Sequence, residues 1–256
     1  MRAWAGVGEA YAASYASLCA GTHDDVVRLL GPARGRRALD VGSGTGALAA
    51  RMSEAGWSVV GCEPEPSMRA VASREHPHLV VVDGALPALP FADAEFDAVT
   101  ANFALNHVPD PRAAAREIVR VAAPGAVMVS TVWVVSPSWF WQGVCQRAGL
   151  VVPSSGALAP EKDFERTTAG FARMLAESGW PAVEVSELSW TWMPTIDELW
   201  RSAEGGVASA GAYYLSLDEG VRSRFALAFE QLCEERAVAG RVPLEHTAAV
   251  AVGAAR

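Results

Sequence analysis

The sequence predicts an α/β fold in which helices cover both faces of a mostly parallel, seven-stranded sheet. Short apolar segments with strand character recur along the first half of the chain, and segments with the spacing of helices separate them. Strands that alternate with helices in this way pair in parallel through right-handed crossovers. A glycine-rich turn, Gly42 to Gly46, directly follows the first strand, which is typical of ligand-binding folds of this class.

The first half of the chain begins with helical sequence. Residues 8–30 have the pattern of one or two helices, and Tyr11 and Tyr15 stand four apart, so they are expected on one face. Four strands follow, each ending at the edge of the sheet where ligands bind in such folds. The strands span 37–41, 57–62, 79–82 and 96–101, helices are predicted at 47–54 and 66–74, and the strands end at the glycine turn, Glu63, Asp83 and Asn102.

The next helix has clear boundary signals. Asp110 is the candidate N-cap, Pro111 fits the first helical position, and Pro124 with Gly125 is expected to end the helix. Beyond it, strands are predicted at 126–133, 183–192 and 242–252, a helix at 171–178, a cap or lid at 134–165 and a helical insertion at 195–241. The prediction is one domain, with a core of about 24–133, 166–194 and 242–254 and with cap or insertion segments of about 1–23, 134–165 and 195–241.

Composition restricts the classes of function. The chain has 256 residues and a formal net charge of -8, without a dense Lys/Arg stripe, so a nucleic-acid partner is not expected. No stretch is long and apolar enough to span a bilayer, and the first residues lack the apolar region of a secretory signal, so we expect a cytoplasmic location. The four cysteines lie far apart without zinc-type spacing, so neither a metal site nor a disulfide framework is expected.

The glycine turn fits two kinds of ligand. The turn and Ala47 match the spacing of dinucleotide-binding folds, and Glu63 lies about twenty residues on, as such folds require. However, Asp40 ends the first strand, where a carboxylate would repel a pyrophosphate and would suit a ligand with a cationic amine and a sulfonium. Together with Asp83, acids end three successive strands, and we expect all three around one crevice at the carboxyl edge of the sheet.

The order of these motifs resembles that of the class I S-adenosylmethionine-dependent methyltransferases, in particular the small-molecule type 11 group. Asp40–Gly46 resembles motif I, Glu63–Met68 resembles the second motif, and Asp83–Ala85, followed by Leu89-Pro90-Phe91, resembles the third. Residues 96–110 resemble the fourth-strand region, and 122–126 resemble the Leu-Lys-Pro-Gly-Gly turn with alanine in the place of the lysine and the last glycine. The resemblance covers roughly residues 10–133. It implies a Rossmann-like sheet whose seventh strand is antiparallel and lies between the fifth and sixth.

The resemblance implies S-adenosyl-L-methionine as the cofactor and S-adenosyl-L-homocysteine as its spent form. In the family, the first acid of the second motif holds both ribose hydroxyls and the aspartate of the third receives the adenine amino group. An N-terminal tyrosine often lies near the methionine part of the cofactor. The expected cofactor-binding residues are Tyr15, Asp40, Gly42, Ser43, Gly44, Gly46, Glu63, Pro64, Met68, Asp83, Gly84, Ala85, Asn102 and Phe103.

Methyl transfer from a sulfonium is an in-line displacement, so the site must above all align its reactants. A base is needed only if the acceptor loses a proton during the attack. His107, after the fourth strand, is the candidate base because a neutral imidazole can take up a proton, and positioning of its loop is the alternative role. The candidate acceptor-binding residues, for which core packing is the alternative, are Tyr11, Trp133, Trp139 and Trp141.

We therefore expect an enzyme that methylates a small, planar or apolar metabolite and that acts as a monomer or homodimer. The Ala/Arg-rich composition resembles that of bacterial chains in which such enzymes often modify specialised metabolites. Three alternatives stay open: an enzyme with the same fold and cofactor that catalyses another reaction such as cyclisation, an NAD-dependent oxidoreductase, and a non-catalytic binding module. The sequence lacks the Lys/Tyr constellation that an oxidoreductase would use at the hydride side.

Overall fold

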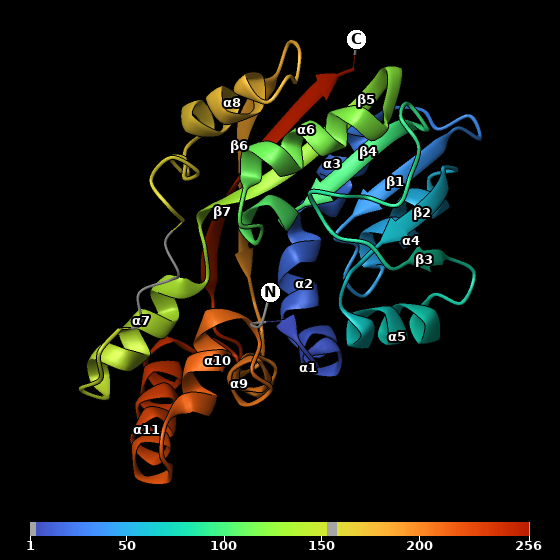
Figure 1. Ribbon diagram of the computed structural model, residues 1–256. Coiled ribbons are helices and arrows are strands. Elements are labelled where there is room, and N and C mark those ends of the chain that lie inside the picture. The colour runs from blue at the N-terminus through green and yellow to red at the C-terminus, as the bar shows by residue number, and fades with distance from the viewer. Residues whose placement is uncertain (1–3, 153–157, 256) are drawn as a thin grey trace.

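The computed structural model describes residues 4–152 and 158–255, which form one sheet flanked by helices (Figure 1). The strands are β1 (Arg37–Val41), β2 (Ser58–Cys62), β3 (Val80–Val82), β4 (Phe96–Asn102), β5 (Ala122–Val135), β6 (Glu184–Trp192) and β7 (Leu244–Ala254). The helices are α1 (Gly8–Ala12), α2 (Tyr15–Cys19), α3 (His23–Leu30), α4 (Ala47–Glu54), α5 (Pro66–Glu75), α6 (Pro111–Val121), α7 (Ser138–Arg147), α8 (Thr168–Glu177), α9 (Ile196–Glu204), α10 (Ala208–Ser216) and α11 (Glu219–Arg236), with short 3-10 turns η2 (Ala20–Thr22) and η3 (Ala104–Asn106).

The sheet has the strand order β3-β2-β1-β4-β5-β7-β6. The strands β1 to β5 pair in parallel, and β7 pairs antiparallel with both β5 and β6. The expected Rossmann-like fold, including the insertion of β7 between the fifth and sixth strands, is thereby confirmed. Because β7 runs opposite to the other strands, its first residues lie at the edge of the sheet where β4 and β5 end.

Helices cover both faces of this sheet. On one face, α3 and α4 bury Val26, Leu30 and Met52 against the central strands. On the other face, α6 and α8 bury Ile118 and Phe171. Each of these side chains is at most 1% exposed, and burial of one such side chain contributes about 1.5–3 kcal/mol. The two apolar layers hold the strand ends of the carboxyl edge in fixed positions.

The N-terminal segment differs from the expectation of one or two helices. The chain forms α1, α2 and α3, and the first break falls at Ala13 and Ser14. Ser14 has a non-helical backbone, and its hydroxyl donates to the Ala10 carbonyl at 2.6 Å, a local bond that competes with continued helix. Tyr11 and Tyr15 therefore belong to different helices, and the prediction that they share one helical face is wrong.

The strand β5 is longer than predicted. It begins immediately after α6, so Pro124 and Gly125 lie inside the strand and do not separate two elements. The pairing of β4 with β5 changes register at this point, which accommodates the two residues as an irregularity of the ladder. The start of α6 is as predicted, since the Asp110 carboxylate accepts the backbone N–H of Ala113 at 2.9 Å.

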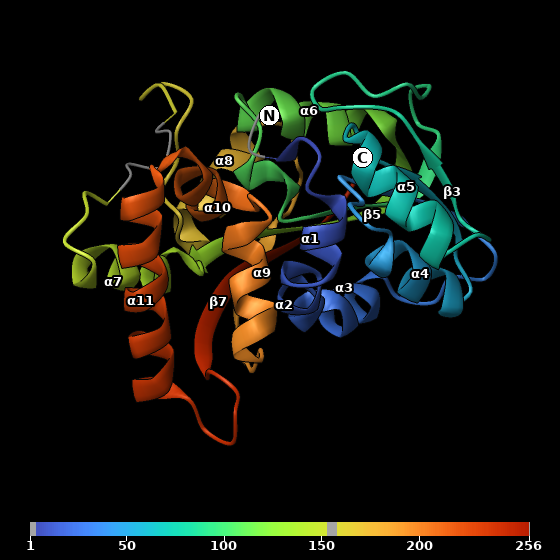
Figure 2. The ribbon, with the colours of Figure 1, turned by 90° about the horizontal axis from the view of Figure 1, so that it is seen from below.

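The segment predicted as a cap or lid contains a helix, α7. Its Trp141 stacks on Phe229 of α11 with ring centroids 5.6 Å apart, within an apolar cluster shared by α7, α9 and α11. Figures 1 and 2 show this helical group at one end of the molecule, with α1 and α2 between it and α5. Residues 1–3 and 153–157 of the predicted cap segments lie outside the described residues. None of the helices described has the length and apolar character that crossing a membrane requires.

Candidate functional site

The glycine turn between β1 and α4 has the backbone conformation that only glycine adopts without strain. Gly42, Gly44 and Gly46 have φ angles of 68°, 55° and 84°. At Gly42 a Cβ atom would come within 2.9 Å of the Ala104 side chain, so the loop after β4 packs directly on the turn. The backbone N–H of Gly42 donates to the Cys62 carbonyl at 2.8 Å, which fixes the turn against the end of β2.

Asp40, at the end of β1, is a buried carboxylate with an incomplete set of partners. Thr100 on β4 donates its hydroxyl to Oδ1 at 2.8 Å, and burial raises the pKa of Asp40 to about 7. Its Oδ2 and the hydroxyl of Ser43 in the turn are buried without a hydrogen-bond partner among the described residues. Buried polar atoms are normally paired, so two unpaired ones beside the turn fit a polar ligand at this position.

Glu63, at the end of β2, is 7% exposed and aligned by backbone groups. Its Oε2 accepts the N–H of Gly44 and its Oε1 accepts the N–H of Glu65, each at 2.9 Å. Burial raises the pKa of Glu63, and these two bonds partly oppose the shift. Each oxygen keeps a second lone pair, so the carboxylate can still accept two hydroxyl donors from a ligand.

Asp83, at the end of β3, lies in a different environment from the other two acids. Its side chain is 73% exposed and pairs with the guanidinium of Arg69 at 3.2 Å. Arg69 also donates to the carbonyl of Glu63 at 2.7 Å, which connects the ends of β2 and β3. Of the three acids expected around one crevice, two are buried carboxylates beside the turn, and the third is an exposed carboxylate at the neighbouring strand end.

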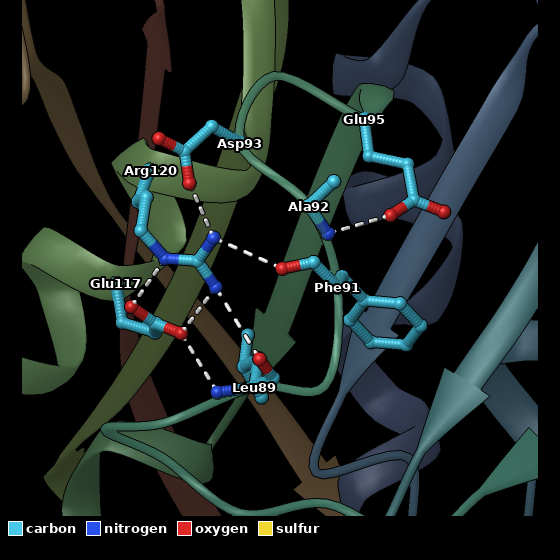
Figure 3. Close-up of polar contacts among 7 residues, drawn as sticks. All are labelled: Leu89, Phe91, Ala92, Asp93, Glu95, Glu117 and Arg120. Carbon is cyan, nitrogen blue, oxygen red and sulfur yellow. Dashed lines mark hydrogen bonds and ion pairs between the residues drawn. The ribbon is translucent and has the colours of Figure 1, made fainter.

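The loop that follows Asp83 is held in place by α6 (Figure 3). Arg120 donates to the carbonyl oxygens of Phe91 at 2.9 Å and Leu89 at 3.3 Å. Glu117, paired with the same guanidinium, accepts the N–H of Leu89 at 2.7 Å. The Leu89-Pro90-Phe91 part of the third motif is therefore anchored on a helix, which restricts the position of Gly84 and Ala85 before it.

The end of β4 carries a connected set of polar groups. The Asn102 amide oxygen accepts the hydroxyls of Thr22 at 2.9 Å and Thr131 at 2.6 Å, and Thr131 in turn accepts the N–H of Phe103 at 2.9 Å. Phe103 has a φ of 56°, a left-handed conformation that this network stabilises. The network fixes where the chain leaves β4, and thus where η3 and the residues after it begin.

His107 follows η3 at the rim of the site. Its ring meets Trp4 edge to face, with centroids 4.8 Å apart. The protein atoms packed around the imidazole lower the pKa of His107 to about 4, although the residue as a whole is exposed to solvent. The imidazole is therefore neutral at neutral pH, and it is a weaker base than a free histidine.

The structure separates the two N-terminal tyrosines. Tyr11 lies over the glycine turn, 3.8 Å from the position of a Cβ on Gly44, and burial together with neighbouring groups that include Glu63 and Asp40 raises its pKa. Tyr15 accepts the indole N–H of Trp141 at 2.7 Å inside the cap, and burial raises its pKa to about 12. Tyr11 is thus beside the residues expected to hold the cofactor. Tyr15 instead lies in the apolar cluster of the cap, and the buried Met68 lies in the same cluster.

The three candidate tryptophans lie in different surroundings. Trp133, at the end of β5, stacks on Phe103 with centroids 3.8 Å apart and planes 9° apart. Trp139 donates to the Glu245 carbonyl at 3.3 Å, and Trp141 lies in the core of the cap. Only Trp133 of the three is therefore in contact with the residues at the end of β4.

Three residues at the site were not among those expected from the sequence: Trp4, Glu65 and Thr100. Thr100 reaches Asp40 because the two residues are paired in the parallel ladder of β1 and β4. The pattern of apolar residues along a strand does not reveal this register. Glu65 stands inside the second motif, two residues after Glu63, so its position was a usable signal. Trp4 has no sequence signal, because its place beside His107 depends on the path of the whole N-terminal segment.

Comparison with known proteins agrees with this arrangement. Residues 39–130 match the family model described as a methyltransferase domain. Over 104 residues the chain is 40% identical to a demethylmenaquinone methyltransferase of Renibacterium salmoninarum, and the match covers 41% of this chain and 44% of that relative. The chain thus spans less than half the length of this relative. The residues that match the family model, 39–130, contain the glycine turn and the strand-end acids.

Solved structures with the same fold cover most of the chain. The YcgJ protein of Bacillus subtilis is 18% identical with a TM-score of 0.58, covering 92% of this chain and 98% of that one. The [4+2]-cyclase SpnF is 21% identical with a TM-score of 0.54, covering 91% and 80%. Phosphoethanolamine N-methyltransferase 2 of Haemonchus contortus, in complex with S-adenosyl-L-methionine, is 17% identical with a TM-score of 0.55, covering 92% and 52%. At these identities the likeness establishes the fold alone.

Proposed function

We propose that this chain is a class I S-adenosylmethionine-dependent methyltransferase that methylates a small planar or apolar metabolite, a proposal supported by the match of residues 39–130 to a methyltransferase domain. The observation that carries the proposal is the pair of buried carboxylates, Asp40 and Glu63, on either side of a glycine turn with unpaired polar atoms. A buried, partly unpaired acid is costly unless a ligand completes its partners. A ligand with hydroxyl donors and a cationic part supplies such partners, whereas a pyrophosphate would be repelled.

The residues around the turn divide the binding of S-adenosylmethionine among themselves. Glu63 would accept the two ribose hydroxyls, since its oxygens are held by backbone N–H groups and keep free lone pairs. Asp40, Ser43 and the glycines would take the methionine side, with Tyr11 as cover in place of Tyr15. The segment Asp83 to Ala85 would meet the adenine, as the family resemblance implies.

The bound cofactor would supply a methyl group on a positively charged sulfur, so no further activation of the leaving group is needed. The protein's contribution is then mainly alignment, which fixed backbone and packed rings can provide. His107 would accept a hydrogen bond or a proton from the acceptor. Because the pKa of His107 is about 4, the neutral imidazole is always ready to accept, but it draws off a proton only weakly.

The acceptor side is supported by the stacked pair of Phe103 and Trp133, with Trp190 5.6 Å from Trp133. Phe103 itself is buried, so the partly exposed ring of Trp133 would be the surface that a flat apolar molecule contacts. The name of the demethylmenaquinone methyltransferase relative points in the same direction, toward a quinone-like ring. We therefore place hydroquinones and phenols first among the acceptors to test.

The experiment is a product analysis with methyl-labelled S-adenosylmethionine and a panel of hydroquinones, phenols and aromatic amines. The proposal predicts a labelled methyl group on one acceptor and an equal amount of S-adenosylhomocysteine. The cyclase alternative has a specific basis, because SpnF has the same fold. Conversion of an acceptor without label transfer or S-adenosylhomocysteine would favour that alternative and reject methylation.

A further inference from the structure

The N-terminal residues 4–12, here called the strap, lie over the candidate cofactor site. Tyr11 covers the turn at Gly44, and Trp4 meets His107 edge to face. Figure 2 shows α1, the helical part of the strap, between α5 and α9. The residues beneath it, including Asp40 and Glu63, are less than 10% exposed. A ligand that binds to their side chains needs a way past this cover.

The strap is fastened to α5 by polar contacts near the surface. The backbones of the strap and α5 come close together at Gly8, where a side chain would not fit: a Cβ atom there would lie 2.4 Å from the Ser67 carbonyl oxygen. Apolar contacts hold the strap to the cap: Val7 is buried there, and Trp4, Ala10 and Tyr11 pack, partly buried, against the same cluster. On the α5 side the fastening is made by hydrogen bonds and an ion pair. The contacts are Gly6 N–H to Glu65 Oε1 at 3.0 Å, Gly8 N–H to the Ser67 hydroxyl at 3.1 Å, and the Arg74 guanidinium to both carboxylate oxygens of Glu9.

Glu65 belongs to both the strap contact and the cofactor site. Its carboxylate accepts the N–H of Gly6 and also caps α5 by accepting the N–H of Ser67 at 3.2 Å. Its own N–H donates to Oε1 of Glu63 at 2.9 Å. One residue therefore joins the cover to the carboxylate that the proposed function assigns to the ribose.

The chain after the strap is held much more firmly. At the non-helical Ala13 and Ser14 the strap gives way to α2, whose Tyr15 is fixed by the buried bond from Trp141. Ser17 of α2 accepts the indole N–H of Trp192 at 3.0 Å. Exposed ion pairs and hydrogen bonds contribute little each, and Val7 is the one buried apolar side chain of residues 4–12, whereas α2 buries both Tyr15 and Leu18. Opening of the strap therefore costs less free energy than release of α2, which remains in place. The break at Ala13 and Ser14 is then the hinge.

We infer that the strap is the gate through which the cofactor enters and leaves, and that Glu65 is a positioning residue that ties the closed gate to Glu63. The inference rests on the proposed cofactor. With the gate closed, Tyr11 lies on the turn and Trp4 on His107, so closure completes the cofactor side and the acceptor side together. Without Glu65 the strap opens more often, and the cofactor exchanges faster in both directions.

The discriminating variant is Glu65→Asp. Aspartate is a good N-cap, so α5 keeps its cap, but the shorter side chain loses its reach to Gly6. The matched control is Glu198→Asp, which shortens a carboxylate that accepts a backbone N–H, that of Thr195 at 2.7 Å, on α9 of the cap. Stopped-flow measurements give association and dissociation rates of S-adenosylhomocysteine, and hydrogen exchange of the Gly6 and Gly8 amides reports strap opening.

The inference predicts that Glu65→Asp raises both rates of S-adenosylhomocysteine exchange by about fivefold, as the loss of one hydrogen bond implies, while Glu198→Asp leaves them unchanged. The Gly6 and Gly8 amides should exchange faster in Glu65→Asp, and bound S-adenosylhomocysteine should slow them in the unmodified protein. Wild-type rates in Glu65→Asp, or a change in dissociation alone, would overturn the gate. Failure of the unmodified protein to bind S-adenosylhomocysteine would instead reject the proposed function, and the gate with it.

Discussion

Replacement of Glu63 by glutamine tests the most specific feature of the candidate site. Both carboxylate oxygens accept backbone N–H groups, from Gly44 and Glu65, each at 2.9 Å. Glutamine keeps the size of the side chain but puts an NH2 group where one oxygen was, so one backbone N–H must face another donor. An N–H left unpaired in this way costs about 1–3 kcal/mol, and relief of the buried charge offsets part of that cost.

The effect on the ligand is larger than the effect on folding. An amide has one oxygen, so it cannot accept two ribose hydroxyls as a carboxylate can. Loss of one such bond weakens binding by about 1–3 kcal/mol, which is roughly a 5- to 150-fold higher dissociation constant. We therefore expect Glu63→Gln to bind S-adenosylhomocysteine at least fivefold more weakly while it remains folded.

The assay is calorimetric titration of S-adenosylhomocysteine into the folded variant, with a urea melt to record its stability. Glu54→Gln is the control, because Glu54 is an exposed carboxylate paired with Arg51 on the far surface of α4. The control should bind like the unmodified protein. If Glu63→Gln binds S-adenosylhomocysteine within twofold of the unmodified protein, the assignment of Glu63 to the ribose is wrong.

Three further predictions follow from single contacts. The pKa of Asp40 is raised from 3.8 to about 7, so the folded chain holds this proton more tightly, and about 3 kcal/mol of unfolding free energy is lost as pH rises from 4 to 7. In urea melts of the ligand-free protein, D40N should gain stability relative to wild type over that window, and a pH-independent difference would contradict the shift. Tyr15→Phe leaves the buried N–H of Trp141 unpaired and should cost about 1–3 kcal/mol of stability without changing S-adenosylhomocysteine affinity, whereas a tenfold loss of affinity would return Tyr15 to the cofactor site. In Gly42→Ala the new methyl group would lie 2.9 Å from the Ala104 side chain, so this variant should bind the cofactor at least about tenfold more weakly. The control Gly35→Ala has a φ of 72° and open space around it, so it should only lower the melting temperature, consistent with a cost of about 1–2 kcal/mol for left-handed backbone. Equal effects of the two variants on affinity would count against the turn as the binding site.

The fold was accessible from sequence because its signals are local. Short apolar strands, a glycine turn and the Asp110 cap with Pro111 each depend on a few consecutive residues, and together they define the alternating pattern. The position of β7 came from the family resemblance alone. The break at Ser14 and the irregularity at Pro124 depend on competition between nearly equal backbone conformations, which a pattern of apolar residues does not resolve.

The candidate site was predictable where strand ends determine it. Asp40 and Glu63 lie at the carboxyl edge as expected, because the backbone path decides their place. Asp83 ends its strand as predicted, but its side chain stays at the surface, where it pairs with Arg69 of the preceding helix α5. The direction of a long side chain depends on such distant partners, and sequence alone does not supply them.

The tyrosines and tryptophans show the same limit in another form. Tyr11 and Tyr15 differ in environment because two residues between them break the helix. Trp141 belongs to the cap because α7 turns it toward α11, and residues 134–165 gave no helical pattern from which to deduce this. The roles assigned to these rings, and the one-domain organisation, stay predictions.

The central claim is that the buried acids around the glycine turn bind a sulfonium nucleoside. Its most direct test is an equilibrium titration of the unmodified protein with S-adenosylmethionine, S-adenosylhomocysteine and NADH, followed by heat of binding. We expect that one molecule of either sulfur compound saturates the site and that NADH gives no heat. Saturable uptake of NADH, with no response to either sulfur compound, would contradict it.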